Sequence, residues 1–221
     1  MVPPALSIDI ISDVVCPWCF IGKRRLEAAL ALYRAQHPDR PEPVVRWWPF
    51  QLNPDMPAAG IDRTTYLERK FGTASVPQIY ARVAAVGREV GIPFAFDKMV
   101  RQPNTLAAHC LVALAGLHGV QDAMQEALFR AYFIAGADLT REETLMQIAL
   151  GAGLQEAAVR ECLSGAEARE QAAREDARAR ELGVEGVPFF IFNHKVAVSG
   201  AQPAEVLLEA MRQSEAEVAV H

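Results

Sequence analysis

Two cysteines separated by two residues carry the clearest chemistry in this sequence. Cys16-Pro17-Trp18-Cys19 follows a predicted strand, and Pro17 favours the first position of a helix, so the two thiols lie one helical turn apart. Thiols at that spacing close a disulfide with little backbone movement. Because a helix N-terminus stabilises a thiolate, we predict Cys16 as a solvent-facing nucleophile. Cys19, one turn inside, is the predicted resolving thiol.

Zinc binding is the structural alternative for the same motif. One Cys-x-x-Cys pair supplies half of a four-ligand zinc site. The other half would need a second spaced pair, but His109 and Cys110 are adjacent, and Cys162 and His194 stand alone. The spacing therefore disfavours zinc, and we expect no metal. Cys110 and Cys162 are predicted to be core residues.

The elements around the cysteine pair predict a strand, a helix and a second strand. Leu6, Ile8 and Ile10 alternate with polar residues, which is typical of a strand. Apolar residues then recur at helical spacing as far as Tyr33, and the segment 44–50 is rich in β-branched and aromatic residues. Near the end of the chain, segments 188–192 and 195–198 predict a hairpin, and a last helix begins near residue 203.

A long helical block separates these two ends. From about residue 62 to residue 182, apolar residues recur every three or four positions. A charged helix at 166–182 leads into the last strands. Without the preceding part of the block, the order βαβαββα predicts an α/β fold: a thioredoxin-like four-stranded sheet with strand order 4-3-1-2. We therefore expect a discontinuous thioredoxin-like domain from residues 1–58 and 166–221. An inserted all-α helical domain of residues 59–165 would meet it with the cysteine pair at the seam.

Composition excludes several classes of function. The 221 residues include 22 Lys and Arg and 27 Asp and Glu, a net charge of −5, whereas proteins that neutralise phosphates are usually basic. We expect no nucleic-acid partner. No apolar run reaches the roughly 18 residues of a membrane-spanning helix. The first 13 residues lack the basic start of a secretory signal, which predicts a cytoplasmic location. A monomer and a homodimer both stay open.

Val187-Pro188, directly before the third strand, is the second motif. In a thioredoxin-like domain a proline at this place is expected in the cis form, opposite the cysteine pair. The cis form would leave the backbone N–H and C=O of Val187 free to pair with an extended substrate.

Four stretches together resemble the DsbA-like thioredoxin-fold oxidoreductases, and within them the FrnE-like cytoplasmic branch. They are SDVVCPWCFIGKRRLE at 12–27, PFQLNPDMP at 49–57, GVP at 186–188 and VSGAQP at 198–203. The resemblance extends from residue 7 to about residue 212. It implies a helical insertion and dithiol–disulfide exchange. It also implies that Cys16, Cys19 and a cis Pro188 are the working residues.

Relatives in the same superfamily suggest an alternative function. Kappa-class glutathione transferases and 2-hydroxychromene-2-carboxylate isomerases resemble this chain in layout, but they carry a serine at the reactive position and lack the second cysteine. This chain keeps both cysteines, which favours redox exchange. In periplasmic relatives a histidine often stands where this chain has Trp18, so we do not infer a strongly oxidising potential. A non-catalytic binding or chaperone-like module is the third interpretation.

Further residues are candidates for substrate binding. Trp18 beside the thiols is a predicted apolar platform, or else it packs at the domain interface. Phe50, Gln51 and Asn53 follow the second strand, where ligands gather in α/β sheets, although packing within the loop is equally compatible. The resemblance places the stretch from Asn104 to His109 in the helical domain above the cysteine pair. His109 then either takes part in the active site or packs at the interface between the two domains.

Two more segments complete the prediction. Ser199-Gly200 corresponds to the place where kappa-class relatives hold a glutathione carboxylate, and free amides there would suit an anion. Lys23, Arg24 and Arg25 predict a solvated basic face. We therefore expect an oxidoreductase that exchanges a disulfide with protein or small-molecule thiols. No cofactor is required, and glutathione remains open as a co-substrate.

Overall fold

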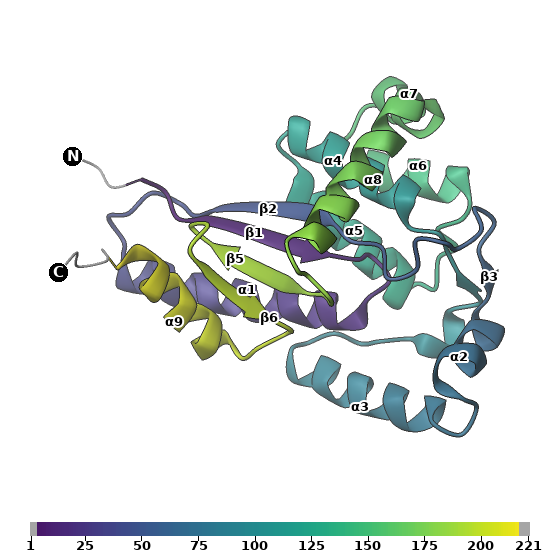
Figure 1. Ribbon diagram of the computed structural model, residues 1–221, viewed down its shortest axis with the longest axis horizontal. Helices are drawn as coiled ribbons and strands as arrows, with labels where there is room; N and C mark the ends of the chain where they lie inside the picture. Colours follow the sequence, from purple (N-terminus) through teal and green to yellow (C-terminus); the bar gives the residue numbers. More distant parts are fainter. Residues whose placement is uncertain (1–3, 217–221) are drawn as a thin grey trace.

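A four-stranded mixed sheet forms the centre of the molecule in the computed structural model, which describes residues 4–216 (Figure 1). The strands are β1 (Ser7–Ser12), β2 (Val44–Pro49), β5 (Phe189–Phe192) and β6 (Val196–Ser199). They lie in the order β2-β1-β5-β6; β1 and β2 are parallel, and the other two pairings are antiparallel. Counted along the chain, this is the predicted order 4-3-1-2, which is confirmed.

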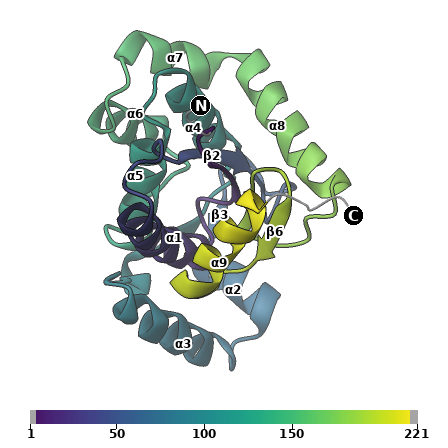
Figure 2. The same cartoon turned by 90° about the vertical axis from the view of Figure 1, so that its left-hand side faces the viewer.

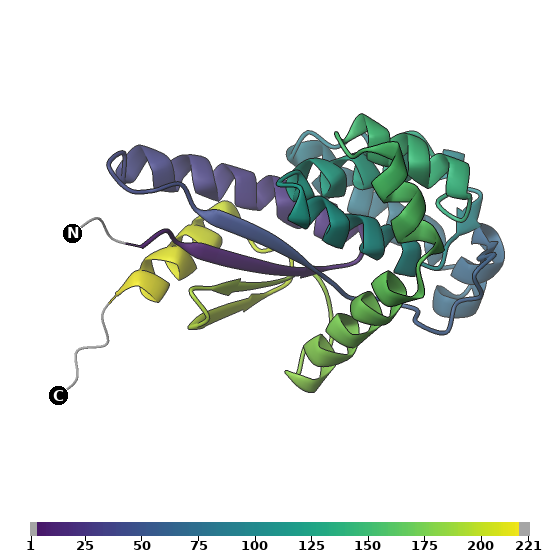
Figure 3. The ribbon, with the colours of Figure 1, turned by 90° about the horizontal axis from the view of Figure 1, so that it is seen from above.

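Helices α1 (Pro17–Gln36) and α9 (Ala204–Glu215) pack side by side on one face of the sheet (Figures 1 and 3). The alternation of side chains in the strands explains this face. Ile8 and Ile10 of β1 are fully buried in one cluster with Phe190 and Phe192 of β5. Asp9 and Ile11, which alternate with Ile8 and Ile10 along β1, point to the opposite face, as the two-residue period of a strand requires.

The opposite face is covered by α8 (Ala166–Glu181), which Figure 3 shows across the sheet from α1. A smaller apolar cluster fills this contact, made of Ile11, Phe50, Ala179 and Val184. The helix is highly charged, and its buried residues include Ala172 and Ala179, because only a narrow stripe of it faces inward.

The segment between β2 and β5 is mainly helical, and most of it lies at one end of the sheet (Figures 1 and 3). Viewed along the sheet, its helices surround the strands (Figure 2). Its other helices are α2 (Arg63–Phe71), α3 (Val76–Glu89), α4 (Leu106–Leu117), α5 (Gln121–Phe133), α6 (Glu142–Gly151) and α7 (Glu156–Ser164), with a 3-10 turn at Phe96–Lys98. A two-residue ladder, β3 (Ile61–Asp62) with β4 (Arg101–Gln102), was not predicted, because two residues are too few to show a period. Among the described residues no helix is both long and apolar enough to cross a membrane.

The turn between β5 and β6 confirms the predicted hairpin. Asn193 and His194 have φ angles of 50° and 56°, the left-handed conformation that a two-residue hairpin turn requires at both positions. Asn193 is further fixed because its Oδ1 accepts a hydrogen bond from the backbone N–H of Ser7 at 2.9 Å.

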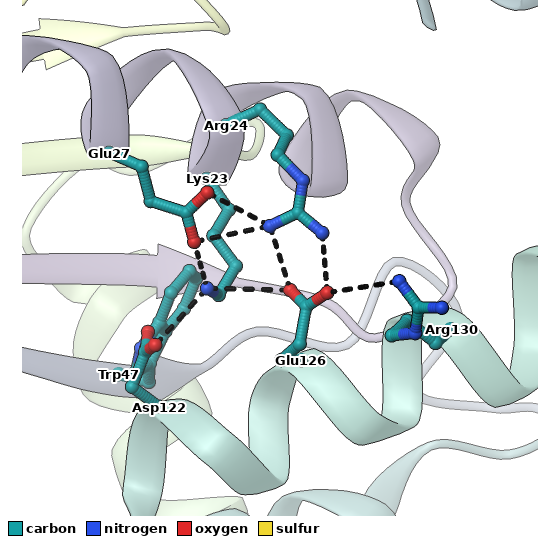
Figure 4. A network of polar contacts seen from close by, with 7 residues as sticks. All are labelled: Lys23, Arg24, Glu27, Trp47, Asp122, Glu126 and Arg130. Carbon is teal, nitrogen blue, oxygen red and sulfur yellow. Dashed lines mark hydrogen bonds and ion pairs between the residues drawn. The ribbon is translucent and has the colours of Figure 1, made fainter. Parts of the chain in front are cut away.

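A network of charges around the buried Lys23 joins α1 to α5 (Figure 4). Lys23 is only 3% exposed, and its Nζ lies 3.1 Å from Asp122 and 3.4 Å from Glu126, as well as against Glu27. Arg24 forms ion pairs with Glu27 and Glu126. The prediction of a solvated basic face is therefore wrong for Lys23. Two of its partners, Asp122 and Glu126, lie about a hundred positions away, on a helix whose packing against α1 the local pattern does not reveal.

The network has a defined dependence on pH. Burial disfavours the charged ammonium, but the charge of Asp122 and the contact with Glu27 outweigh it and raise the pKa of Lys23. Burial likewise disfavours the Glu126 carboxylate, but the hydrogen bond from Arg24 and the charge of Lys23 outweigh it and lower the Glu126 pKa. A raised lysine pKa stabilises the fold fully below the unfolded value of about 10.4. A lowered glutamate pKa stabilises it above about 4.3.

We expect Lys23→Met to lower the free energy of unfolding by about 2 kcal/mol near pH 7, because three carboxylates lose a shared cation. The loss stays modest because Glu27 and Asp122 are exposed to solvent and only Glu126 is partly buried. The difference between the variant and the wild type should shrink below about pH 4, as Glu126 is protonated, and above about pH 11, as Lys23 loses its proton. Urea unfolding across this range measures it. A difference that stays constant from pH 3 to pH 11 would contradict the electrostatic explanation.

Candidate functional site

Cys16 occupies the N-cap of α1, where its backbone is extended with φ −93° and ψ 113°. Pro17 follows at the start of the helix, as predicted. The backbone N–H of Cys16 donates to the Asp13 carbonyl at 3.0 Å, and the N–H of Cys19 donates to the Cys16 carbonyl at 3.0 Å. These bonds close the strand-to-helix turn and hold the two thiols one turn apart. All four cysteines are free thiols.

Both thiols of the pair are enclosed. Cys19 is 0% exposed, as expected for a resolving thiol, but Cys16 is only 4% exposed, so the prediction of a solvent-facing Cys16 is wrong. The Cys16 thiol donates to the backbone carbonyl of Val187 at 3.5 Å, and its side chain belongs to the main apolar cluster. The sequence places Cys16 at a helix start but does not show that the segment before β5 closes over it.

Burial separates the chemistry of the two thiols. Burial, followed by the hydrogen bond with Cys16 and the charge on Cys16, raises the pKa of Cys19 well above its usual value. The Ser12 hydroxyl and the backbone N–H of Asp13 oppose this rise only in part. Because its pKa is raised, Cys19 is protonated at neutral pH.

The segment Val187-Pro188 stands against the cysteine pair, and the peptide bond between the two residues is cis. The Val187 carbonyl receives the Cys16 thiol, and the Pro188 carbonyl accepts the backbone N–H of Gly200 at 2.8 Å. The Gly200 amide is thus already bonded, which leaves it no free N–H for an anion. Ser199 is exposed at the end of β6.

Gly22 lies where α1 meets Pro188. A β-carbon at Gly22 would lie 2.9 Å from Cγ of Pro188 and 3.2 Å from Cζ of Phe190, closer than normal contacts allow. We expect Gly22→Ala to lower the free energy of unfolding by about 1–2 kcal/mol in spite of the better helix propensity of alanine. Disulfide exchange should slow as well, because the clash moves Pro188 away from Cys16.

Gly151→Ala is the matched control for this substitution. Gly151 ends α6, and a β-carbon there would meet nothing within 4 Å, so alanine should leave stability unchanged or raise it. Thermal unfolding and an exchange assay on both variants make the comparison. Equal effects of the two substitutions would show that contact with Pro188 does not matter.

Asp13 is a buried residue in the turn before Cys16, at the base of the site, and it was not among the residues predicted from the sequence. Its carboxylate is 0% exposed and accepts the backbone N–H of Leu52 at 2.8 Å and of Val15 at 3.4 Å. His109 of α4 brings its Nε2 to 3.4 Å from Asp13 Oδ1. The structure therefore places His109 beside the floor of the site, buried and in contact with Asp13. An acidic residue three positions before the first cysteine was the available signal.

Of the remaining candidate residues, Phe50, Asn53 and Asn104 lie in loops, and Trp18 lies in α1 between the two cysteines. Phe50 is 2% exposed and packs in the cluster beneath α8, so it has no exposed ring for a substrate. The amide of Asn53 bonds to the Tyr66 hydroxyl at 3.1 Å. Asn104 accepts the N–H of Leu106 at 2.9 Å and donates to the Met56 carbonyl at 2.7 Å. These asparagines hold loops in place. Trp18 is half-buried against the main apolar cluster.

Within residues 4–216, no group of three or more His, Cys, Asp or Glu side chains could hold a metal ion. The arrangement has the components of thiol chemistry: an N-cap cysteine, a sealed second cysteine with a raised pKa, and a backbone carbonyl against the first sulfur.

Comparison with known proteins agrees with this geometry. The family model described as DSBA-like thioredoxin domain matches residues 7–212. A probable DsbA oxidoreductase from Streptomyces coelicolor superposes with a TM-score of 0.87 at 30% identity, covering 98% of this chain and 92% of its own.

More distant structures share the fold. The cytosolic disulfide reductase DsbM from Pseudomonas aeruginosa, solved with glutathione, is 18% identical, with a TM-score of 0.63 over 94% of this chain and 95% of its own. A 2-hydroxychromene-2-carboxylate isomerase is 17% identical, with a TM-score of 0.69 over 94% of this chain and 95% of its own. At these identities the likeness concerns the fold alone.

Proposed function

We propose, from the premise that the chain belongs to the DSBA-like thioredoxin domain family, that it exchanges a disulfide between Cys16-Cys19 and protein or small-molecule thiols. The observation that carries the proposal is the unequal environment of the two thiols. Cys16 caps a helix and touches the Val187 carbonyl, while Cys19 is sealed one turn inside with a raised pKa. Cys16 is placed to attack the substrate first, and Cys19 is placed to resolve the mixed disulfide that forms on Cys16.

The exchange has two steps. In the reducing direction, the Cys16 thiolate attacks one sulfur of a substrate disulfide; a mixed disulfide forms on Cys16, and the first substrate thiolate leaves. Cys19 then attacks the Cys16 sulfur, the mixed disulfide breaks, and the second substrate thiol departs with the proton that Cys19 loses. Two electrons pass from the dithiol to the substrate. The reverse sequence oxidises a dithiol substrate.

The enclosed thiols require a local movement of the covering segment before a large substrate can react. Val187 is half-buried and makes the covering contact to Cys16, so displacement of its carbonyl would expose the sulfur. The backbone of an extended substrate is the proposed replacement for that contact.

We also propose a cytoplasmic reaction that glutathione recycles. The support is the fold shared with the cytosolic disulfide reductase DsbM, which was solved with glutathione. Membership of the FrnE-like branch stays a prediction.

A turnover assay separates the three candidate functions. We expect the purified protein to reduce oxidised glutathione or insulin disulfides in a reaction that needs both cysteines. An isomerase or transferase would need glutathione but keep its activity in Cys19→Ser. A binding module would show no turnover, with a cysteine pair that stays inert to oxidants; that result would overturn the proposal.

A further inference from the structure

Three buried side-chain atoms of the described residues have no hydrogen-bond partner of normal geometry: Oγ of Ser12, Nε2 of His109 and Nε2 of Gln125. Two of them lie at the floor of the cysteine pair. His109 faces the Asp13 carboxylate at 3.4 Å, whereas the Ser12 hydroxyl makes no hydrogen bond. A buried hydroxyl without a partner is unfavourable, so native proteins rarely contain one without a reason.

The position of Ser12 is fixed by its backbone. It is the last residue of β1, 2% exposed, and its carbonyl accepts the N–H of Phe50 at 3.0 Å. Because side chains alternate along a strand, the Ser12 side chain points to the same face as Ile8 and Ile10, the face on which α1 packs. Cys19 lies completely buried in the first turn of α1.

The thiol of Cys19 is the titratable group whose pKa this hydroxyl affects. Contact with Ser12 lowers the pKa of Cys19, against the burial that raises it, and the Asp13 backbone N–H acts in the same direction. A neutral thiol is a weak acceptor, whereas a thiolate is a strong one. The hydroxyl thus gains a full partner only when Cys19 ionises, which happens during the resolving step.

We infer that Ser12 is a catalytic residue whose hydroxyl donates a hydrogen bond to the Cys19 thiolate as it attacks the mixed disulfide on Cys16. The inference rests on the proposed function. The Cys16–Cys19 bond forms, the bond from Cys16 to the substrate sulfur breaks, and the proton lost by Cys19 ends on the departing thiol. Ser12 keeps its own proton throughout. The backbone N–H of Asp13 favours the same negative charge on Cys19.

Ellman's reagent, an aromatic disulfide that releases a coloured thiolate, resolves the two steps. Attack by Cys16 releases the first coloured thiolate, and attack by Cys19 releases the second. In Ser12→Ala we expect the first phase to keep its rate within about twofold. The second should slow by about tenfold, and the pH midpoint of its rate should rise. Cys19→Ser, which lacks the second phase, identifies the signal.

The two remaining thiols do not obscure this reading. Burial raises the pKa of Cys110 to about 12 and also raises the pKa of Cys162, so both react slowly in the folded protein. The double variant Cys16→Ser, Cys19→Ser measures their contribution directly.

If Ser12→Ala does not fold, Ser12→Thr and Ser12→Val provide the comparison, because they differ only in a hydroxyl against a methyl group. The threonine variant should keep a fast second phase, and the valine variant should lose it. A second phase with unchanged rate and pH midpoint in folded Ser12→Ala, or equal rates for threonine and valine, overturns the role of Ser12. A wild-type protein that shows no second phase contradicts the proposed function itself.

Discussion

Replacement of Cys16 by serine is expected to lower the rate of disulfide exchange by more than about 1,000-fold, because a hydroxyl is a far weaker nucleophile than a thiolate. Replacement of Cys19 should act differently. Cys16 can still attack in Cys19→Ser, so the variant should accumulate a mixed disulfide with its substrate that only an external thiol releases. Turnover assays and intact-mass measurement of the trapped species test both statements.

Cys110→Ser serves as the matched control for the loss of a thiol. Cys110 is a buried cysteine of α4 outside the pair, so this variant should lose stability but keep its turnover per folded molecule. Comparable activity losses in Cys16→Ser and Cys110→Ser would contradict the assignment of the nucleophile. Trapping of substrate on any cysteine other than Cys16 in the Cys19→Ser variant would do the same.

Asp13→Ala should cause the largest loss of stability among the site residues. The carboxylate is completely buried, and its removal leaves the N–H groups of Leu52 and Val15 without their acceptor and His109 without its neighbour. We expect the free energy of unfolding to fall by about 3–4 kcal/mol, since breaking a buried charged network leaves several desolvated groups unpaired. Exchange should slow too, because the Asp13–Val15 turn positions Cys16.

Asp13→Asn keeps the shape of the side chain and one acceptor oxygen. It should therefore cost about half as much, with exchange only partly reduced. Urea unfolding followed by tryptophan fluorescence, with the first phase of the reaction with Ellman's reagent, measures both effects. A free energy of unfolding within about 0.5 kcal/mol of the wild type in Asp13→Ala would show that the turn does not depend on the carboxylate.

The sequence was informative where reactive residues lie in segments that show a clear helical or strand period. The Cys16–Cys19 spacing and the proline after Cys16 were enough to predict the helix start, because this feature depends on neighbours within a few residues. The strand order was predicted differently, by matching the element order βαβαββα to the thioredoxin topology.

Features that depend on distant segments could not be predicted in the same way. Lys23 reads as a surface residue because its acidic partners on α5 lie far away in sequence. Cys16 reads as exposed because the covering segment at Val187 comes from the far end of the chain. Ser12 and Asp13 read as the polar end of a strand, and only the packed helices show that both are sealed beneath the thiols.

The central claim is that Cys16 and Cys19 interconvert between dithiol and disulfide within the folded chain. The most direct measurement is to equilibrate the protein in glutathione buffers of graded redox ratio, quench with an alkylating agent, and map the cysteines by mass spectrometry. The account predicts a reversible two-electron transition confined to Cys16 and Cys19, with Cys110 and Cys162 alkylated as free thiols only after unfolding. A cysteine pair that stays reduced in the most oxidising buffer, or a disulfide formed at other positions, would contradict it.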